Sequence, residues 1–112
     1  MVDNGIPRVY YPIMEHEDAA KRLCELGNTT RLSIFRYLIK VGTDGVPVGQ
    51  IQKAIGIPGS TLSHHISRMV SVGLIRQNRE SRTLYCTAQY DALRELIDFL
   101  QSECCTGANG CS

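Results

Sequence analysis

Two short helical patterns separated by a brief break lie in the middle of this chain. Apolar residues recur at helical spacing from Pro47 to Ile55 and again over residues 60–72, and a proline suits the first turn of a helix. These stripes consist of Val48, Ile51, Ile55, Leu62, Ile66, Met69 and Val70. Between them, residues 56–59 read Gly-Ile-Pro-Gly, a sequence that interrupts a helix. Two short helices joined by such a turn predict a helix-turn-helix.

The flanking sequence predicts two helices before this pair, and a hairpin and a helix after it. Asn28 is a good N-cap for the second helix, Gly42 is a suitable stop, and residues 43–46 form a turn. After Gly73 the apolar period changes to two, which is typical of strands, with Glu80-Ser81 at the tip between them. We expect helices over 15–26, 29–41, 47–55, 60–72 and 89–102 and strands over 74–79 and 82–88. The predicted fold is mainly α with a small β-hairpin (α+β), a winged helix-turn-helix.

The chain of 112 residues divides into one domain with two short extensions. Residues 1–14 carry two prolines and no helical period and are expected to be an arm, residues 15–102 the folded domain, and residues 103–112 a flexible cysteine-rich tail. With 43% apolar and 21% charged residues the composition is that of a globular protein. The sequence has neither a signal-peptide pattern nor an apolar run long enough for a membrane span. We therefore expect a cytoplasmic protein with no membrane partner.

Charge is distributed unevenly along the chain, although the net charge is only +1. Residues 31–82 hold eight Lys or Arg against two Asp or Glu, whereas residues 1–30 have net charge −2 and residues 83–112 net charge −3. A basic middle between acidic ends is typical of a surface that faces nucleic acid. Chance clustering would produce the same numbers, so charge alone does not decide between the two.

The helix expected over residues 60–72 has an outward face of short polar side chains and no acidic residue. Hydroxyl groups allow close approach to a DNA backbone and donate to phosphates or base edges, while an ordinary solvated face is richer in Glu and Lys. Three arginines on the hairpin suit phosphate or minor-groove contact, although a solvated hairpin also carries arginines. The expected DNA-contacting residues are Ser60, Thr61, Ser63, His64, Ser67, Arg68, Arg76, Arg79 and Arg82.

Four segments together resemble one family. Leu26 to Leu32 reads LGNTTRL and resembles the LGDPTRL opening of the ArsR/SmtB family of bacterial transcriptional repressors. The segments 63–66, 72–75 and 79–85 resemble its SxHL, AGLV and RxGRxxxY signatures. The resemblance covers about residues 15–102. Thr29 stands where the family has a proline, and Ser81 replaces the wing glycine, which leaves the wing turn open.

The resemblance implies a dimeric repressor whose binding to operator DNA weakens when a metal or metalloid binds. The last helix independently suggests a dimer, because it is amphipathic and the small core has little surface to cover it. Packing of the first and last helices against a second copy would bury that stripe and present two recognition helices to a palindrome. The expected interface residues are Leu23, Leu93, Leu96, Ile97 and Leu100.

The effector is predicted from the cysteines. Many members of the family ligate metal through a CVCDL-like motif, but the matching residues 48–52 contain no thiol or imidazole, and residues 89–102 contain no histidine for a zinc site. The tail holds Cys104, Cys105 and Cys111, with two glycines between them. Three thiolates suit a soft ion, and trivalent arsenic takes three sulfurs without a fourth ligand. This pattern resembles the C-terminal arsenite site of one ArsR subgroup, so we expect release by arsenite or antimonite.

The cysteines are also compatible with other functions. An incidental thiol-rich tail is the plain alternative, and a repressor that senses oxidants or persulfide through Cys104, Cys105 or Cys24 would have the same fold. The third class is a thiol enzyme or a metal-sequestering protein. A thiol oxidoreductase is expected to carry Cys-x-x-Cys beside a βαβ unit, but neither occurs, and such an enzyme would not need the basic face. The sequence contains no Ser-His-Asp set, Gly-rich phosphate loop or paired carboxylates in a plausible pocket. We expect no enzymatic activity.

Overall fold

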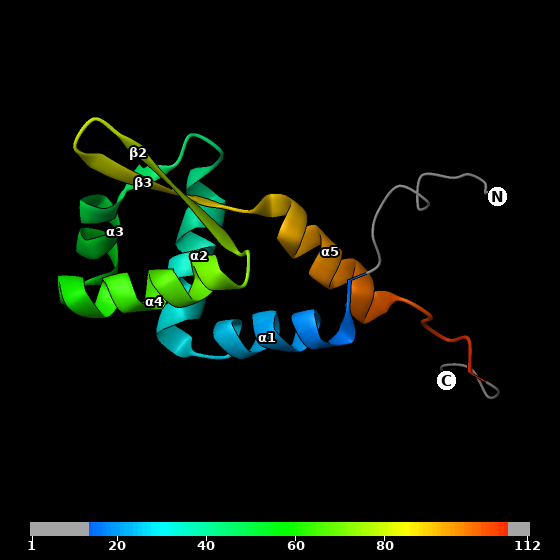
Figure 1. Cartoon of the computed structure of the whole chain (residues 1–112). Coiled ribbons are helices and arrows are strands. Elements are labelled where there is room, and N and C mark those ends of the chain that lie inside the picture. Colours follow the sequence, from blue (N-terminus) through cyan, green and yellow to red (C-terminus); the bar gives the residue numbers. More distant parts are fainter. Residues whose placement is uncertain (1–13, 108–112) are drawn as a thin grey trace.

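The computed structural model describes residues 14–107, which form five helices and one three-stranded antiparallel sheet (Figure 1). The elements are α1 (His16–Leu26), α2 (Thr29–Val41), β1 (Val46–Pro47), α3 (Val48–Ile55), α4 (Gly59–Ser71), β2 (Ile75–Glu80), β3 (Thr83–Ala88) and α5 (Tyr90–Gln101). The predicted winged helix-turn-helix is confirmed: α3 and α4 form the helix-turn-helix, and the β2–β3 hairpin forms the wing. The expected arm, except for Met14, and residues 108–112 of the tail lie outside the described residues.

A capping residue begins α2 and a stop residue ends α3. The Asn28 side chain accepts a hydrogen bond from the Arg31 backbone N–H at 3.0 Å, which caps α2. Gly56 ends α3 in the left-handed conformation with φ of 77°, which a residue with a Cβ adopts only at a cost. The short turn that follows brings α4 across α3 in the arrangement of a helix-turn-helix (Figure 1).

A third strand was not expected. Val46 was predicted to lie in a turn and Pro47 in the first turn of a helix, but both pair with β3, opposite Cys86 and Tyr85. The strand order is β1-β3-β2, so β1 is an edge strand. Proline has no N–H to donate to a ladder, and an edge strand tolerates it because that side of the strand can face solvent. Two residues are too few to show a strand period, and the partner is about 40 positions away, so sequence pattern could not find this pairing.

The tip of the wing differs by one residue from the prediction. Glu80 pairs with Thr83, so the connecting residues are Ser81 and Arg82 rather than Glu80 and Ser81. Ser81 has φ of 60°, a left-handed conformation that glycine adopts more easily. The turn anticipated for a glycine is therefore made by a serine, and Arg82 is placed at the end of the hairpin.

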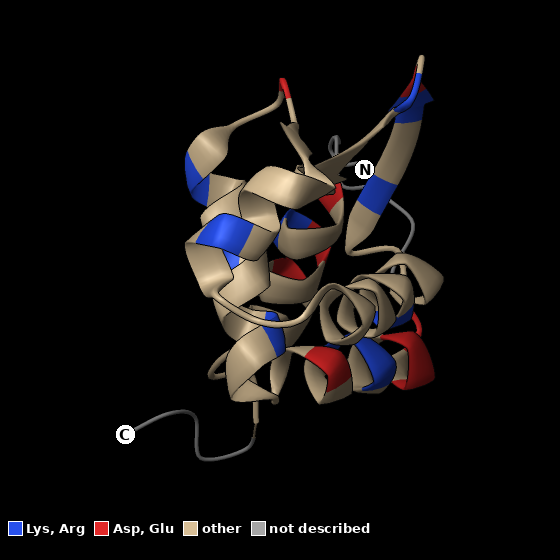
Figure 2. Ribbon diagram, turned by 90° about the vertical axis from the view of Figure 1, so that its left-hand side faces the viewer, with Lys and Arg blue, Asp and Glu red and all other residues tan. Residues whose placement is uncertain are grey.

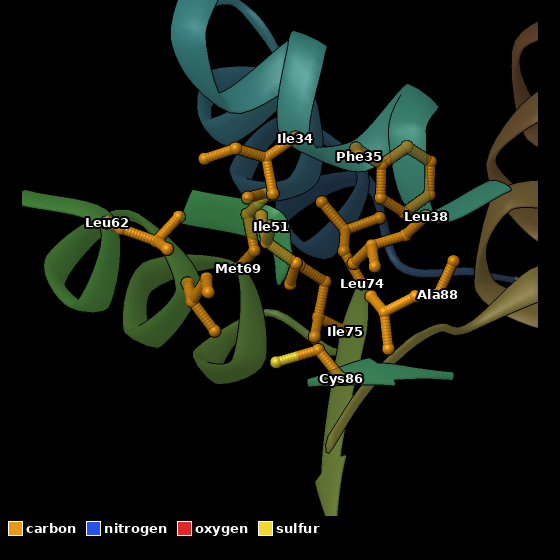
Figure 3. Packing of buried hydrophobic residues seen from close by; sticks show 12 residues of the cluster. Ile34, Phe35, Leu38, Ile51, Leu62, Met69, Leu74, Ile75, Cys86 and Ala88 are labelled. Atoms are coloured by element: carbon orange, nitrogen blue, oxygen red, sulfur yellow. The ribbon is translucent and has the colours of Figure 1, made fainter. Parts of the chain in front are cut away.

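The core lies where α2, α3 and α4 meet the sheet (Figure 3). Ile34, Ile51 and Leu62 are fully buried and come from the three helices, while Ile75 and Cys86 reach them from the wing strands. This packing fixes α4 by its apolar side and leaves its polar side outward. Within residues 14–107, no helix combines the length and the apolar composition needed to cross a bilayer.

Candidate nucleic-acid interface

The outward side of α4 is exposed along its length. Leu62, Ile66 and Met69 are buried in the core, so helical geometry turns the intervening residues to solvent. The residues Ser60, Thr61, Ser63, His64 and Ser67 are all exposed, as expected from sequence. We call these five residues the polar face of α4. It presents hydroxyl and imidazole groups on a rigid helix with no carboxylate among them.

The wing adds positive charge beside this face. Arg76, Arg79 and Arg82 are all exposed, and Figure 2 shows the basic bands along the hairpin. A groove of about 510 Å³ separates wing and helix, lined by Ser63 of α4 and by Gln77 and Arg82 of the wing, among other residues. The sequence did not single out Gln77, because a polar residue on a strand gives no signal until the strand is known to border a groove.

Arg68 was expected to contact DNA, but its guanidinium is engaged within the domain. Its Nε donates to Glu25 Oε1 at 2.8 Å and its Nη2 donates to Glu25 Oε2 at 3.1 Å, so both carboxylate oxygens of this α1 residue accept hydrogen bonds from Arg68. A bidentate pair of this kind has a fixed geometry. Arg68 therefore joins α4 to α1, while its side chain remains 43% exposed, so its contact with DNA stays a prediction.

Glu25 is the centre of a cluster that joins three helices. It is 8% exposed, and besides Arg68 its Oε1 lies 3.1 Å from Nε of Arg31 on α2. The hydrogen bonds from Arg68, together with the charges of Arg68 and Arg31, lower the pKa of Glu25 below 4.5, although burial acts in the opposite direction. Arg31 also reaches His65 of α4, with Nη1 3.2 Å from Nδ1. We call Glu25, Arg31, His65 and Arg68 the Glu25 cluster; sequence pattern missed it because its members are far apart in the chain.

His65 should make stability fall on acidification. Burial and then the Arg31 guanidinium lower the pKa of His65 below 6.5, and Nδ1 can accept from Arg31 only while the ring is neutral. The unfolded chain therefore takes up a proton before the folded one does. Stability is highest above pH 6.5 and decreases as the pH falls below it, by at most about 1.4 kcal/mol per pH unit for one proton.

Urea unfolding between about pH 7.5 and pH 5.5 measures this effect. His65→Gln is expected to remove that part of the pH dependence, and His64→Gln, the same change at the exposed neighbouring position, is the control that keeps it. An unchanged pH dependence in His65→Gln would show that another group is responsible.

The expected dimer-interface residues differ in how much of each side chain is exposed in the single chain. Leu23, Ile97 and Leu100 are 41%, 45% and 57% exposed, which is high for large apolar side chains. Leu93 is half-buried against the core. Leu96 is only 2% exposed within one chain, so it has almost no surface left to offer to a partner, contrary to expectation. Periodicity placed it on the apolar stripe but could not say that its own chain already covers it.

The described cysteines lie on α1, on β3 and just beyond α5. Cys104 and Cys105 follow the end of α5, are exposed, and have their Sγ atoms 3.4 Å apart. Cys111 lies outside the described residues, so the three-thiol site stays a prediction. Within residues 14–107, no three Cys, His, Asp or Glu side chains converge as metal ligands. Cys24 is exposed, and Cys86 is buried, where burial raises the pKa of its thiol.

Comparison with known proteins agrees with this architecture. A family model described as a helix-turn-helix domain matches residues 26–78. The nodulation protein NolR of Rhizobium meliloti is 30% identical over 92 residues, which are 80% of this chain and 73% of that protein. A putative arsenical resistance operon repressor of Halobacterium salinarum is 30% identical over 81 residues, 70% of this chain and 67% of that protein.

A solved structure extends the similarity to the whole fold. It is the homodimeric winged helix-turn-helix DNA-binding domain of a possible ArsR-family transcriptional regulator from Mycobacterium bovis. The two chains are 26% identical and superpose with a TM-score of 0.63, over 78% of this chain and 81% of the other. The similarity therefore includes the recognition helix, the wing and the flanking helices.

Proposed function

The chain belongs to the ArsR-type winged helix-turn-helix transcriptional regulators, and we propose that it is a repressor that binds palindromic operator DNA as a homodimer and leaves it when arsenite or antimonite binds. One observation carries the DNA-binding part: Ser63 of the polar face of α4 and Arg82 of the wing border the same groove, and the other polar-face residues and wing arginines are exposed. Hydroxyl groups on a helix suit base edges in a major groove, and guanidiniums beside them suit the flanking phosphates.

The dimer rests on the exposed apolar side chains of α1 and α5. Leu23, Ile97 and Leu100 keep about half of their apolar surface exposed, at 41%, 45% and 57%. A second copy related by a twofold axis would cover all three and repeat the recognition helix once. The related domain from Mycobacterium bovis is described as homodimeric, which supports the same assembly here.

The effector proposal rests on the tail. Cys104, Cys105 and Cys111 lie within eight residues, and trivalent arsenic or antimony would bind all three as thiolates. Because only thiolates bind such an ion, that site requires the reduced chain. One relative carries the name of an arsenical resistance operon repressor. The alternative effector is an oxidant or a persulfide acting on the same sulfurs.

Loss of wing arginines should weaken DNA binding without regard to sequence. The probe is a duplex that the wild-type protein selects from a random pool, and the readout is fluorescence anisotropy at several salt concentrations. Arg79→Ala and Arg82→Ala should each weaken binding to every duplex and reduce the salt slope by about 1 per lost phosphate contact. Ser63→Ala and His64→Ala should instead change the preference among sequences.

Arg94→Ala is the matched control, because this exposed arginine of α5 pairs only with Asp91 among the described residues. It should leave both affinity and salt slope unchanged. If the wing variants and the α4 variants all bound the selected duplex like the wild type, the DNA interface would have to lie elsewhere.

A further inference from the structure

Helix α1 is attached to the rest of the domain mainly by polar contacts. All of its residues are described, and only two of them, Ala19 and Glu25, are buried. Leu26 is its one residue that packs against the main hydrophobic core, and it is half-buried. A helix held this weakly by apolar burial takes its position from its hydrogen bonds and ion pairs.

Two of these contacts hold α4 at separate points. Glu25 accepts both hydrogen bonds from Arg68 in the last turn of α4. Arg22, one turn earlier on α1, donates from Nε to the carbonyl oxygen of Val72, just beyond α4, at 2.9 Å. Its Nη1 also lies 3.5 Å from Oε1 of Glu95 on α5. We call Arg22 and Glu25 the α1 latch.

The fit at the Arg22 contact is close. Gly73 follows Val72 with φ of 81°, and a Cβ at this position would lie 3.2 Å from Nη2 of Arg22. A glycine is therefore suited there on two grounds, conformation and space. The guanidinium lies directly against the chain that leaves the recognition helix and enters the wing.

Leu23, which lies between the two latch positions in sequence, is exposed on α1. Leu23 is 41% exposed, while Arg22 and Glu25 face α4. One turn of α1 thus carries both part of the proposed dimer surface and the hold on α4. A shift of α1 against a second copy would move α4 with it, as long as both latch contacts remain.

We propose that Arg22 and Glu25 are positioning residues that fix the recognition helix relative to the dimer surface, and so set the half-site spacing that the dimer accepts. The inference rests on the proposed function, because it needs a dimer on a palindrome. The latch contacts no DNA itself. Its role is to make two recognition helices behave as one rigid pair, whose separation must match successive major grooves.

The test compares duplexes that differ only in spacing. They are the palindrome selected by the wild-type protein, the same palindrome with one base pair inserted at its centre, and a single half-site. An inserted base pair moves the half-sites apart by about 3.4 Å and rotates them by about 35°. The wild type should discriminate strongly against the insertion. Glu25→Gln and Arg22→Met should each reduce that discrimination at least about threefold, while half-site affinity stays within about twofold of the wild type.

Each variant removes one latch contact by a different route. Arg22→Met keeps the apolar stem and loses the donor to Val72 and the ion pair with Glu95. It leaves Arg68 paired, so an effect shared by both variants cannot come from a released Arg68. Glu17→Gln makes the same chemical change at an exposed position of α1 and should behave like the wild type. Sedimentation and thermal unfolding verify that every variant is a folded dimer.

The outcomes separate the two proposals. Spacing discrimination equal to that of the wild type in both latch variants would overturn the positioning role. An equal loss of affinity for the half-site and for the full palindrome would also overturn it. Such a result would mean that the DNA-contacting surface is damaged, and not that the two recognition helices are less firmly positioned. A wild type that selects no palindrome, or that ignores spacing, would overturn the proposed function itself.

Discussion

Aspartate in place of Ile97 or Leu100 is expected to give a folded monomer that binds the palindrome at least about a hundredfold more weakly than the wild type. Both side chains are exposed in the single chain, at 45% and 57%, so a carboxylate there disturbs no internal packing. In the proposed dimer the same carboxylate would be buried without a partner, which is unfavourable by several kcal/mol. A monomer retains one recognition helix and loses the second half-site.

Two further substitutions make this result specific. Leu32→Asp places the same charge at a leucine of similar exposure, 42%, on α2, outside the proposed interface, and should remain dimeric. Leu96→Asp should unfold the protein instead of separating the subunits, because Leu96 is covered within its own chain. Sedimentation equilibrium and operator anisotropy provide the measurements. Intact dimers for both Ile97→Asp and Leu100→Asp would place the interface on another surface.

The difference between Leu96 and its neighbours shows what a sequence pattern can and cannot predict here. Helical spacing correctly placed Leu96, Ile97 and Leu100 on one amphipathic helix, because periodicity depends only on local geometry. Which side chain is covered within the chain and which remains exposed depends on tertiary packing, including how α1 and α5 cross. That crossing is set partly by the Arg22–Glu95 contact, between residues 73 positions apart.

The same distinction applies to the site. The polar face of α4 was predictable because it is the complement of a strong apolar stripe on one helix. Arg68 belongs to the same helix and was assigned to DNA for the same reason, but Glu25 of α1 accepts its hydrogen bonds. Glu25 itself gave no signal, since a glutamate near an apolar stripe is usually a solvated residue. Only the fold brings the two charges together.

Arsenite should release the reduced wild-type protein from its operator, and serine in place of the tail cysteines should abolish that release. Cys104 and Cys105 follow α5, at the opposite end of the molecule from α3 and the tip of the wing (Figure 1). Arsenic bound there cannot occupy the DNA surface, so it must bind two arrangements of the dimer with different affinity. Useful release requires about 10² to 10³-fold weaker DNA binding, or ~3–4 kcal/mol of coupling.

The geometry indicates how such coupling would reach the DNA. Three thiolates gathered on one ion would alter how α5 packs against the partner, and α5 contacts α1 through Glu95 and Arg22, which in turn holds the end of α4. Titration of the reduced, operator-bound dimer with arsenite, zinc and polysulfide, read by anisotropy, tests the effector. Variants Cys104→Ser, Cys105→Ser and Cys111→Ser should bind the operator normally and respond weakly, whereas Cys24→Ser and Cys86→Ala should still respond.

Reciprocity supplies an independent measurement of the same coupling. If arsenite weakens operator binding by a given factor, operator DNA must weaken arsenite binding by the same factor, which competition with a chromogenic dithiol can measure. Release by polysulfide but not by arsenite would favour the redox alternative. Release by arsenite at the wild-type concentration in a variant with all three tail cysteines replaced by serine would move the sensor away from the tail. The exposed Cys24, one residue before Glu25 on α1, would then be the first position to examine.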